Sequence, residues 1–226
     1  MKINRISFNT LLTLDYTGAG PSADLSDKFD GTSEVILLLH GYEQKASSIL
    51  GKLQSVRPSH TKFIAPNGIF PVPRRVGSSF KVGYSWYFFD PHSNEYLIDM
   101  SVSVQAIVSL IEKLEFQSIP KRIIGFSQGG YLAPFVAHRL KNVRQVIGVG
   151  CDYLIDELPP GIEYRWDGIH GKRDEIVDWK KSQLSHSRLS ELGIEGKFYT
   201  LEEVGHDLSP PVVETLAQVL RGENAA

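Results

Sequence analysis

The sequence is short of features that would point to several classes of protein. It has one cysteine, Cys151, among 226 residues, so no intramolecular disulfide can form and a thiolate-rich zinc site is excluded. Neither sign of charge is in excess, because 24 Lys and Arg residues stand against 26 Asp and Glu, a formal net charge of -2. Nucleic acid or an anionic membrane would favour concentrated positive charge. We therefore expect no metal and no nucleic acid partner.

Long hydrophobic runs are also missing. No uncharged stretch approaches the length of a membrane-spanning helix, so the sequence predicts no integral membrane insertion. The first 18 residues contain Lys2 and Arg5, but apolar and polar residues alternate there and no long apolar core follows. We expect this segment to be folded chain and, with a single cysteine, the location to be cytoplasmic.

What the sequence does have is a series of short apolar runs that alternate with segments of helical spacing. The runs lie at 34–40, 61–67, 121–127, 143–151 and 197–204, and their continuity predicts strands buried on both faces. Apolar residues recur every three or four positions from Leu97 to Leu114 and from Val213 to Leu220, which predicts helices. This alternation predicts one α/β domain over residues 1–226, with a mostly parallel, doubly wound sheet and helices on both faces.

Three other stretches do not follow this alternation of strand and helix patterns. INRISF and LLTLDY flank Asn9 and Thr10 and predict an antiparallel hairpin at one edge of the sheet. The polar stretch from Thr17 to Ser33 predicts a surface connector without chemistry. The stretch from Gly68 to Asp90, residues 68–90, contains two prolines, basic residues and several aromatics. It is too long for a simple connector, and we predict a substrate loop there.

The chemistry is indicated by Gly-Phe-Ser-Gln-Gly at Gly125 to Gly129, which fits G-x-S-x-G between a predicted strand and a predicted helix. A sharp strand-to-helix turn of this kind exposes the serine hydroxyl, and its glycines remove side chains that would clash. It also leaves backbone N–H groups at the start of the helix free to stabilise an oxyanion. The pattern therefore predicts Ser127 as a nucleophile. The alternative is a Gly-Ser turn that only begins a helix.

A serine nucleophile needs a histidine base and a carboxylate that orients it. In the chain order Ser, Asp, His, Asp174 lies in a loop after a predicted strand and His206 in a Gly-containing loop before the last helix. Asp178 is the alternative carboxylate, less favoured because it falls where a helix should already have begun. The remaining histidines have no positioned partner in the pattern and are expected to be structural or solvated: His40, His60, His92, His138, His170 and His186.

An oxyanion needs two convergent donors. The first central strand ends at His40 and Gly41, and the loop that follows should supply one of them. The backbone N–H of Tyr42 is our candidate, together with the backbone N–H of Gln128 after the nucleophile. The alternative is that His40 and Gly41 merely end a strand in a tight turn.

Six segments, taken together, resemble one family: LLLHGYEQKA, FIAPNGIFPVP, SWYFFD, IIGFSQGGYLA, IHGKRDEIV and VGHDLSP. They resemble the phospholipase/carboxylesterase family of α/β-hydrolases, which includes the acyl-protein thioesterases, over nearly all the chain from Glu34 onward. The resemblance implies an esterase or thioesterase that needs no cofactor and acts on acylated small molecules, lipids or proteins. It implies Ser127, Asp174 and His206 as the triad, with Tyr42 and Gln128 at the oxyanion positions.

The same resemblance bears on substrate binding. A Trp-Phe-Asp-like segment lies near the acyl pocket in the family, which makes Trp86 a substrate-binding candidate; ordinary core is the alternative. Cys151 and Asp152 differ from the usual family residues and are candidates for a wall of the site. Glu43 replaces a glycine of many members and puts a carboxylate near the oxyanion loop.

Two alternative functions stay open from the sequence. One is a binding protein that keeps the hydrolase fold without turnover, an alternative that Glu43 keeps open. The other is a dienelactone-type esterase of small molecules. The natural substrate and the oligomeric state, including a homodimer, are not fixed by the sequence.

Overall fold

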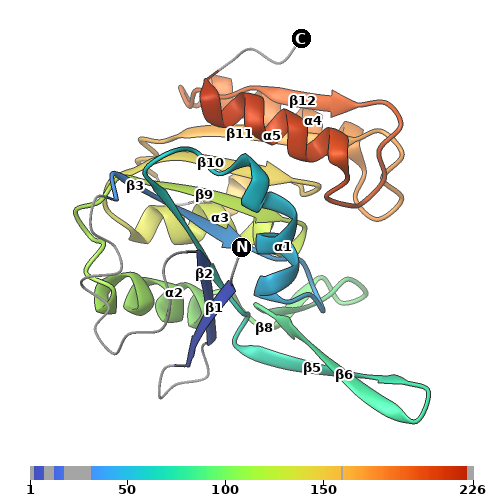
Figure 1. Cartoon of the computed structure of the whole chain (residues 1–226). Coiled ribbons are helices and arrows are strands. Elements are labelled where there is room, and N and C mark those ends of the chain that lie inside the picture. Colours follow the sequence, from blue (N-terminus) through green and yellow to red (C-terminus); the bar gives the residue numbers. More distant parts are fainter. Residues whose placement is uncertain (1–2, 8–12, 18–31, 159, 223–226) are drawn as a thin grey trace.

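A mostly parallel, eight-stranded sheet lies at the centre of the described part of the chain (Figure 1). The computed structural model describes residues 3–7, 13–17, 32–158 and 160–222. Strands β1 and β2 pair antiparallel and β2 joins β4 antiparallel, whereas the other neighbours are parallel. The predicted fold class is confirmed, including the edge hairpin; its turn at Asn9 and Thr10 and most of the connector from Thr17 to Ser33 lie outside the described residues. In sheet order the strands are β1 (Ile3–Ser7), β2 (Thr13–Thr17), β4 (Thr61–Pro66), β3 (Glu34–Leu39), β9 (Lys121–Phe126), β10 (Val143–Val149), β11 (Arg165–Gly171) and β12 (Phe198–Leu201).

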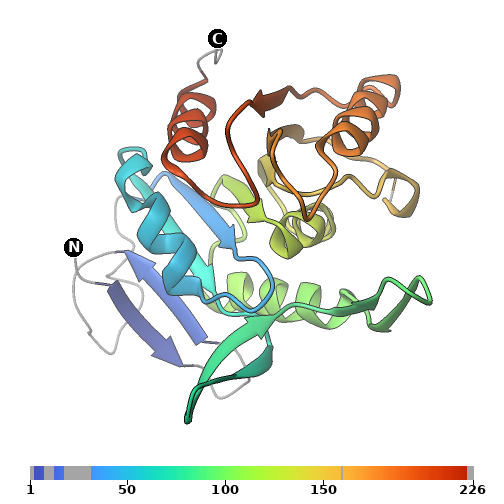
Figure 2. The same cartoon turned by 90° about the vertical axis from the view of Figure 1, so that its right-hand side faces the viewer.

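Helices cover both faces of the sheet (Figures 1 and 2). Strand β3 shows why its sequence is continuously apolar. Val35, Leu37 and Leu39 belong to the core under α2, α3 and α4, whereas Ile36 and Leu38 belong to the core under α1 and α5. No helix among the described residues is long and apolar enough to cross a membrane. The helices are α1 (Ala46–Leu53), α2 (Ser101–Lys113), α3 (Gln128–Arg139), α4 (Trp179–Glu191) and α5 (Pro210–Arg221), with short 3-10 turns η2 (Gln54–Val56) and η3 (Ile155–Glu157).

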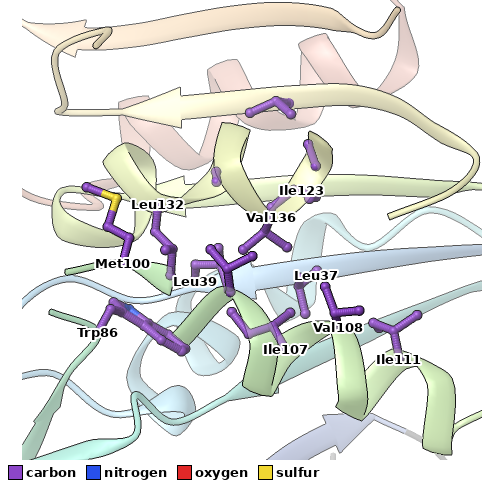
Figure 3. Close-up of a cluster of buried hydrophobic side chains, with 14 of the residues drawn as sticks. Leu37, Leu39, Trp86, Met100, Ile107, Val108, Ile111, Ile123, Leu132 and Val136 are labelled. Atoms are coloured by element: carbon purple, nitrogen blue, oxygen red, sulfur yellow. The ribbon is translucent and has the colours of Figure 1, made fainter. Parts of the chain in front are cut away.

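Helix α2 connects the apolar spacing of the sequence with the packing of the core. Ile107 and Ile111 lie on the side of α2 that meets Leu37 of the sheet (Figure 3). Each fully buried side chain of this size contributes about 1.5–3 kcal/mol. The expectation that the helical pattern starts at Leu97 is wrong. Helix α2 begins at Ser101, and Leu97 is 71% exposed in strand β8 (Glu95–Ile98).

The predicted loop over residues 68–90 is also wrong in form, because this stretch is mostly strand. A hairpin extends from the body of the protein and turns at Gly77, whose φ is +60° (Figures 1 and 2). Pro71 and Pro73 suggested a break, but they occupy alternate positions of a strand that pairs on one side only. A proline is tolerated there because its missing N–H would point away from the partner strand. The elements are β5 (Phe70–Val76), β6 (Ser79–Ser85) and β7 (Phe88–Asp90), the last paired with β8.

The connectivity brings distant residues to one edge of the sheet. Parallel strands all end at the same edge, where open α/β sheets bind their ligands. His40 follows β3, Ser127 follows β9, Asp174 lies just after β11, and His206 lies in the loop after β12. The fold therefore gathers the candidate residues without any long-range sequence signal.

Candidate active site

The turn between β9 and α3 is held in a strained conformation. Ser127 has φ 51° and ψ -120°, a region that non-glycine residues rarely occupy and that costs about 1–3 kcal/mol. A Cβ at Gly125 would lie 2.2 Å from the carbonyl oxygen of Gly129, and a Cβ at Gly129 would lie 2.3 Å from that of Leu39. Both positions need glycine because neighbouring backbone occupies the space. The close packing keeps the strained serine in place.

The side chains of Ser127, His206 and Asp174 form one hydrogen-bonded chain. His206 Nε2 lies 2.8 Å from Ser127 Oγ, and His206 Nδ1 lies 2.7 Å from Asp174 Oδ2. An ionised carboxylate only accepts, so Nδ1 carries the proton and Nε2 is left to accept from the serine hydroxyl. The Asp174 side chain is fully buried, whereas His206 keeps 17% of its side-chain surface exposed. This arrangement can move a proton off the serine.

Asp174 is held as a charged group. Burial raises the pKa of this carboxyl, but the Val177 N–H, the His206 imidazole and the Ile176 N–H together outweigh that effect and leave the pKa below its usual value. Asp174 is therefore ionised at neutral pH. The alternative carboxylate, Asp178, lies at the N-terminus of α4 and caps it by accepting from backbone N–H groups.

One candidate oxyanion donor, Gln128, directly follows the serine in the chain, and the other, Tyr42, follows a glycine that packs on the serine. A Cβ at Gly41 would lie 3.3 Å from Ser127 Cβ, so the turn after β3 packs directly on the strained serine. That turn is closed by the Gln44 N–H, which donates to the Gly41 carbonyl at 3.2 Å. Among the described residues, the backbone N–H groups of Tyr42 and Gln128 have no protein acceptor. Both are free to donate to a ligand.

Glu43 adopts the backbone conformation that a glycine would take. Its φ is 58°, so the left-handed turn is retained although the residue carries a side chain. The turn is clamped from outside, because a Cβ at Gly83 would lie 1.9 Å from the Glu43 carbonyl oxygen. The carboxylate itself is exposed.

The side chains of His40 and Trp86 hold the turn after β3 by hydrogen bonds. His40 Nδ1 donates to the Gly41 carbonyl at 2.7 Å, and the Gly68 N–H donates to His40 Nε2 at 2.9 Å. Burial lowers the pKa of His40 to about 4, against a smaller opposing effect of the Gly41 carbonyl, so the ring stays neutral. Trp86 Nε1 donates to the His40 carbonyl at 2.8 Å. Trp86 is fully buried, so it offers no surface to a substrate and lies instead in the core of Figure 3.

The candidates for a wall of the site are buried as well. Cys151 is 1% exposed, and its sulfur is so close to α3 that a Cβ at Gly130 would lie 2.6 Å from it. Burial raises the pKa of the Cys151 thiol, which therefore stays neutral. Asp152 accepts from the Tyr153 N–H and the Ser185 hydroxyl. The structure thus places Cys151 behind the site.

Two contacts near the site were not anticipated from the sequence. The Gln128 side chain accepts from the Trp86 N–H at 3.0 Å and donates to the Tyr87 carbonyl at 2.9 Å, which ties the end of the hairpin to α3. His170 Nε2 lies 3.1 Å from Asp174 Oδ2, the same oxygen that meets His206. The spacing of four residues between His170 and Asp174 was the only sequence signal for the second contact.

No metal centre is evident in the part of the chain that the structure describes. No group of three or more His, Cys, Asp or Glu side chains there is arranged to hold a metal ion.

The sequence and the fold of this chain are similar to those of known proteins. Residues 23–223 match the model of the phospholipase/carboxylesterase family. An acyl-protein thioesterase 1 homolog of Dictyostelium discoideum is 27% identical over 208 residues, which is 83% of this chain and 89% of that protein. Acyl-protein thioesterase 1 of Aspergillus fumigatus is 32% identical over 115 residues, 45% of this chain and 47% of that protein. In structure, a carboxylesterase from Mesorhizobium loti superposes with a TM-score of 0.71 at 17% identity, covering 97% of this chain and 99% of that one.

The arrangement of the sheet and helices, together with the family match, identifies the fold as an α/β-hydrolase fold. The chain belongs to the phospholipase/carboxylesterase family of that fold. The Dictyostelium and Aspergillus relatives are both named as acyl-protein thioesterases.

Proposed function

We propose that this protein is a serine carboxylesterase or thioesterase that hydrolyses acyl esters or thioesters. The observation that carries the proposal is the contact chain from Ser127 Oγ to His206 Nε2 at 2.8 Å and from His206 Nδ1 to Asp174 Oδ2 at 2.7 Å. Membership of a family whose relatives bear esterase and thioesterase names supports the same conclusion.

The first half of the reaction acylates the serine. His206 takes the hydroxyl proton on Nε2 as Ser127 Oγ attacks the acyl carbonyl carbon, and the carbonyl oxygen becomes an oxyanion. The backbone N–H groups of Tyr42 and Gln128 stabilise it, a contribution of about 2.7–4 kcal/mol per donor in such sites. Asp174 stabilises the imidazolium. His206 then gives its proton to the departing alcohol or thiol, and the acyl group remains on Ser127.

The second half returns the free enzyme. Neutral His206 takes a proton from water as the water oxygen attacks the acyl-enzyme carbonyl, and a second oxyanion forms in the same place. When it collapses, the proton returns from His206 to Ser127 Oγ and the carboxylic acid leaves. Ser127, His206 and Asp174 end as they began, and no cofactor enters either step.

The β5–β6 hairpin is the proposed element for substrate preference. It carries exposed apolar residues beside basic ones, and Arg75 lies 5.8 Å from the ring of Phe80. The Tyr42 side chain is 47% exposed and meets the edge of Phe88 on β7, which adds aromatic surface next to the oxyanion donors. These groups suit an acyl chain of a small molecule or lipid better than a small polar ester.

The test is hydrolysis of a short nitrophenyl ester by Ser127→Ala, with Ser118→Ala as a matched control in an exposed turn. We expect the first variant to lose activity by at least about a thousandfold and the second to keep it. Equal rates for both variants would contradict the proposal. A panel of esters and thioesters of increasing acyl length then separates a lipid or thioester enzyme from a small-molecule esterase.

A further inference from the structure

The carboxylate of Asp174 has all its acceptor positions filled. Oδ1 accepts from the N–H groups of Ile176 and Val177, each at 2.9 Å. Oδ2 faces two imidazoles, His206 Nδ1 at 2.7 Å and His170 Nε2 at 3.1 Å. An ionised carboxylate offers about four lone-pair positions, so each has one partner. Of these partners, only His206 also touches the serine, and the role of His170 needs an explanation.

The contacts of His170 fix its tautomer. Its Nε2 faces Asp174 Oδ2 and also the Val177 carbonyl oxygen at 3.2 Å, and both can only accept. Nε2 therefore carries the proton. Nδ1 is buried and has no hydrogen-bond partner among the described residues, so a second proton there would have no acceptor.

The surroundings keep His170 neutral. Burial lowers its pKa, and this effect outweighs Asp174 and the Val177 carbonyl, which raise it. On β12, the ring of Phe198 lies 6.2 Å from the His170 ring, measured between the two centroids. The titratable groups that act on it are Asp174, from its own loop, and His206, from the loop after β12. The side chain is 1% exposed, so bulk water cannot supply the missing partner.

We propose that His170 is a positioning residue for the reaction: its Nε2–H occupies one lone pair of Asp174 Oδ2 and so directs the other onto His206 Nδ1. The inference rests on the proposed serine hydrolase function and deepens it. His170 does not exchange protons with the substrate. It sets the direction of the carboxylate and limits how strongly Asp174 attracts the proton of the His206 imidazolium.

The chain offers a matched control in His186. This histidine is also buried, donates from Nε2 to the Trp166 carbonyl oxygen at 2.9 Å, and packs against the same Phe198 ring. It has no contact with Asp174. A purely structural role for His170 would make the two histidines equivalent in their effect on catalysis.

The experiment compares His170→Leu, His170→Gln and His186→Leu in a nitrophenyl ester assay from pH 5 to 9. For His170→Leu we expect kcat to fall about tenfold with little change in KM, because a charge-assisted hydrogen bond to the carboxylate is lost. The acid limb of the kcat/KM profile should also move to higher pH, since Asp174 with one donor fewer holds the imidazolium proton more tightly. His170→Gln, whose amide can donate to Asp174, should recover most of both effects, and His186→Leu should show neither.

Nitrogen NMR of the unmodified protein tests the proposal without any variant. We expect the His170 ring to be in the Nε2–H form between pH 7 and 8. A ring protonated on both nitrogens in that range, or an acid limb that moves equally in His170→Leu and His186→Leu, would overturn the inference. Because the tautomer does not depend on turnover, an inactive protein with the expected tautomer would contradict the proposed function and leave the contact itself intact.

Discussion

The turn that carries Ser127 and the β5–β6 hairpin are joined through the Gln128 side chain, yet they are constrained in opposite ways. At the turn, an added Cβ at Gly129 would meet a backbone oxygen at 2.3 Å, whereas at the hairpin tip an added Cβ at Gly77 would meet nothing within 4 Å. Around Ser127, neighbouring backbone fills the space beside Gly125 and Gly129. Along the hairpin most side chains, such as Phe80 at 65% exposure, meet solvent.

Under the proposed function, this difference separates the residues that carry out the reaction from those that set substrate preference. Reaction geometry requires positions set to a fraction of an ångström, and here backbone packing sets them. The hairpin can change its side chains at little cost to folding, so substrate preference can vary there while the reaction is kept. Substitutions in the turn and in the hairpin should therefore differ both in the property that they change and in the size of the effect.

The largest effect should come from Asp174→Asn. The amide keeps the shape but favours the wrong tautomer of His206, and in serine hydrolases this change lowers kcat by about ten-thousandfold. Asp178→Asn is the matched control four residues away, because asparagine caps a helix as well as aspartate does. We expect it to keep full activity towards a nitrophenyl ester. Similar losses in the two variants would contradict our choice of carboxylate.

Next in size is Gly129→Ala. The new methyl group would overlap the Leu39 carbonyl, so α3 must shift and we expect a loss of about 3 kcal/mol of unfolding free energy together with most activity. Gly77→Ala, where only the left-handed φ is at stake, should cost about 1 kcal/mol and leave kcat unchanged. Urea unfolding and ester hydrolysis measure both. Equal destabilisation by the two changes would remove the contrast between turn and hairpin.

The free energy of unfolding should depend on pH because His40 is buried next to the site. The folded pKa of His40 is lowered to about 4, whereas an unfolded histidine titrates near 6.5. Between these values the unfolded chain binds a proton that the folded chain does not, so stability falls as pH falls. We expect a loss of about 2 kcal/mol between pH 7 and pH 5, increased by His170 and His186, whose pKa values are also lowered. Urea midpoints that agree at the two pH values would count against a neutral, buried His40.

A smaller effect is expected from the hairpin. Replacing Phe80 and Val82 by serine removes exposed apolar surface without touching the sheet core. We expect kcat/KM for long acyl esters to fall about threefold to tenfold, while the short ester is unaffected, since each apolar contact contributes about 1 kcal/mol. An equal loss for short and long esters would assign the hairpin a scaffold role.

The smallest effect should come from Glu43→Gly. Glycine accepts a φ of 58° without strain, so we expect about 1 kcal/mol of added stability and an unchanged kcat. Thermal unfolding and the ester assay measure both quantities. A gain of activity by more than tenfold would show that the Glu43 carboxylate hinders the oxyanion donors.

The sequence predicted the sheet and the relative order of the candidate residues because both follow from local patterns. Continuous apolar runs such as the one that becomes β3 require burial on both faces, and parallel strands must end at one edge. That rule brings Ser127, Asp174 and His206 together although they lie far apart in the chain. The glycines at 125 and 129 carried a second local signal.

The rest depended on contacts that no local pattern encodes. The hairpin was not predicted because prolines such as Pro71 and Pro73 are typical of loops. They are compatible with a strand here because β5 pairs on one side only, which the sequence does not reveal. The sequence does not assign Trp86 to the core, because its indole N–H donates to the carbonyl of His40, a residue far away in the chain. His170 looked like any buried histidine, since its bond to Asp174 depends on how the loop after β11 folds back.

The most direct test of the central claim is covalent labelling with a fluorophosphonate followed by peptide mass spectrometry. A serine activated by His206 should react with the probe, so we predict one label per chain, carried by Ser127, with none in Ser127→Ala and much slower labelling in His206→Ala. Absence of label in the folded protein, or label on another residue, would contradict the account.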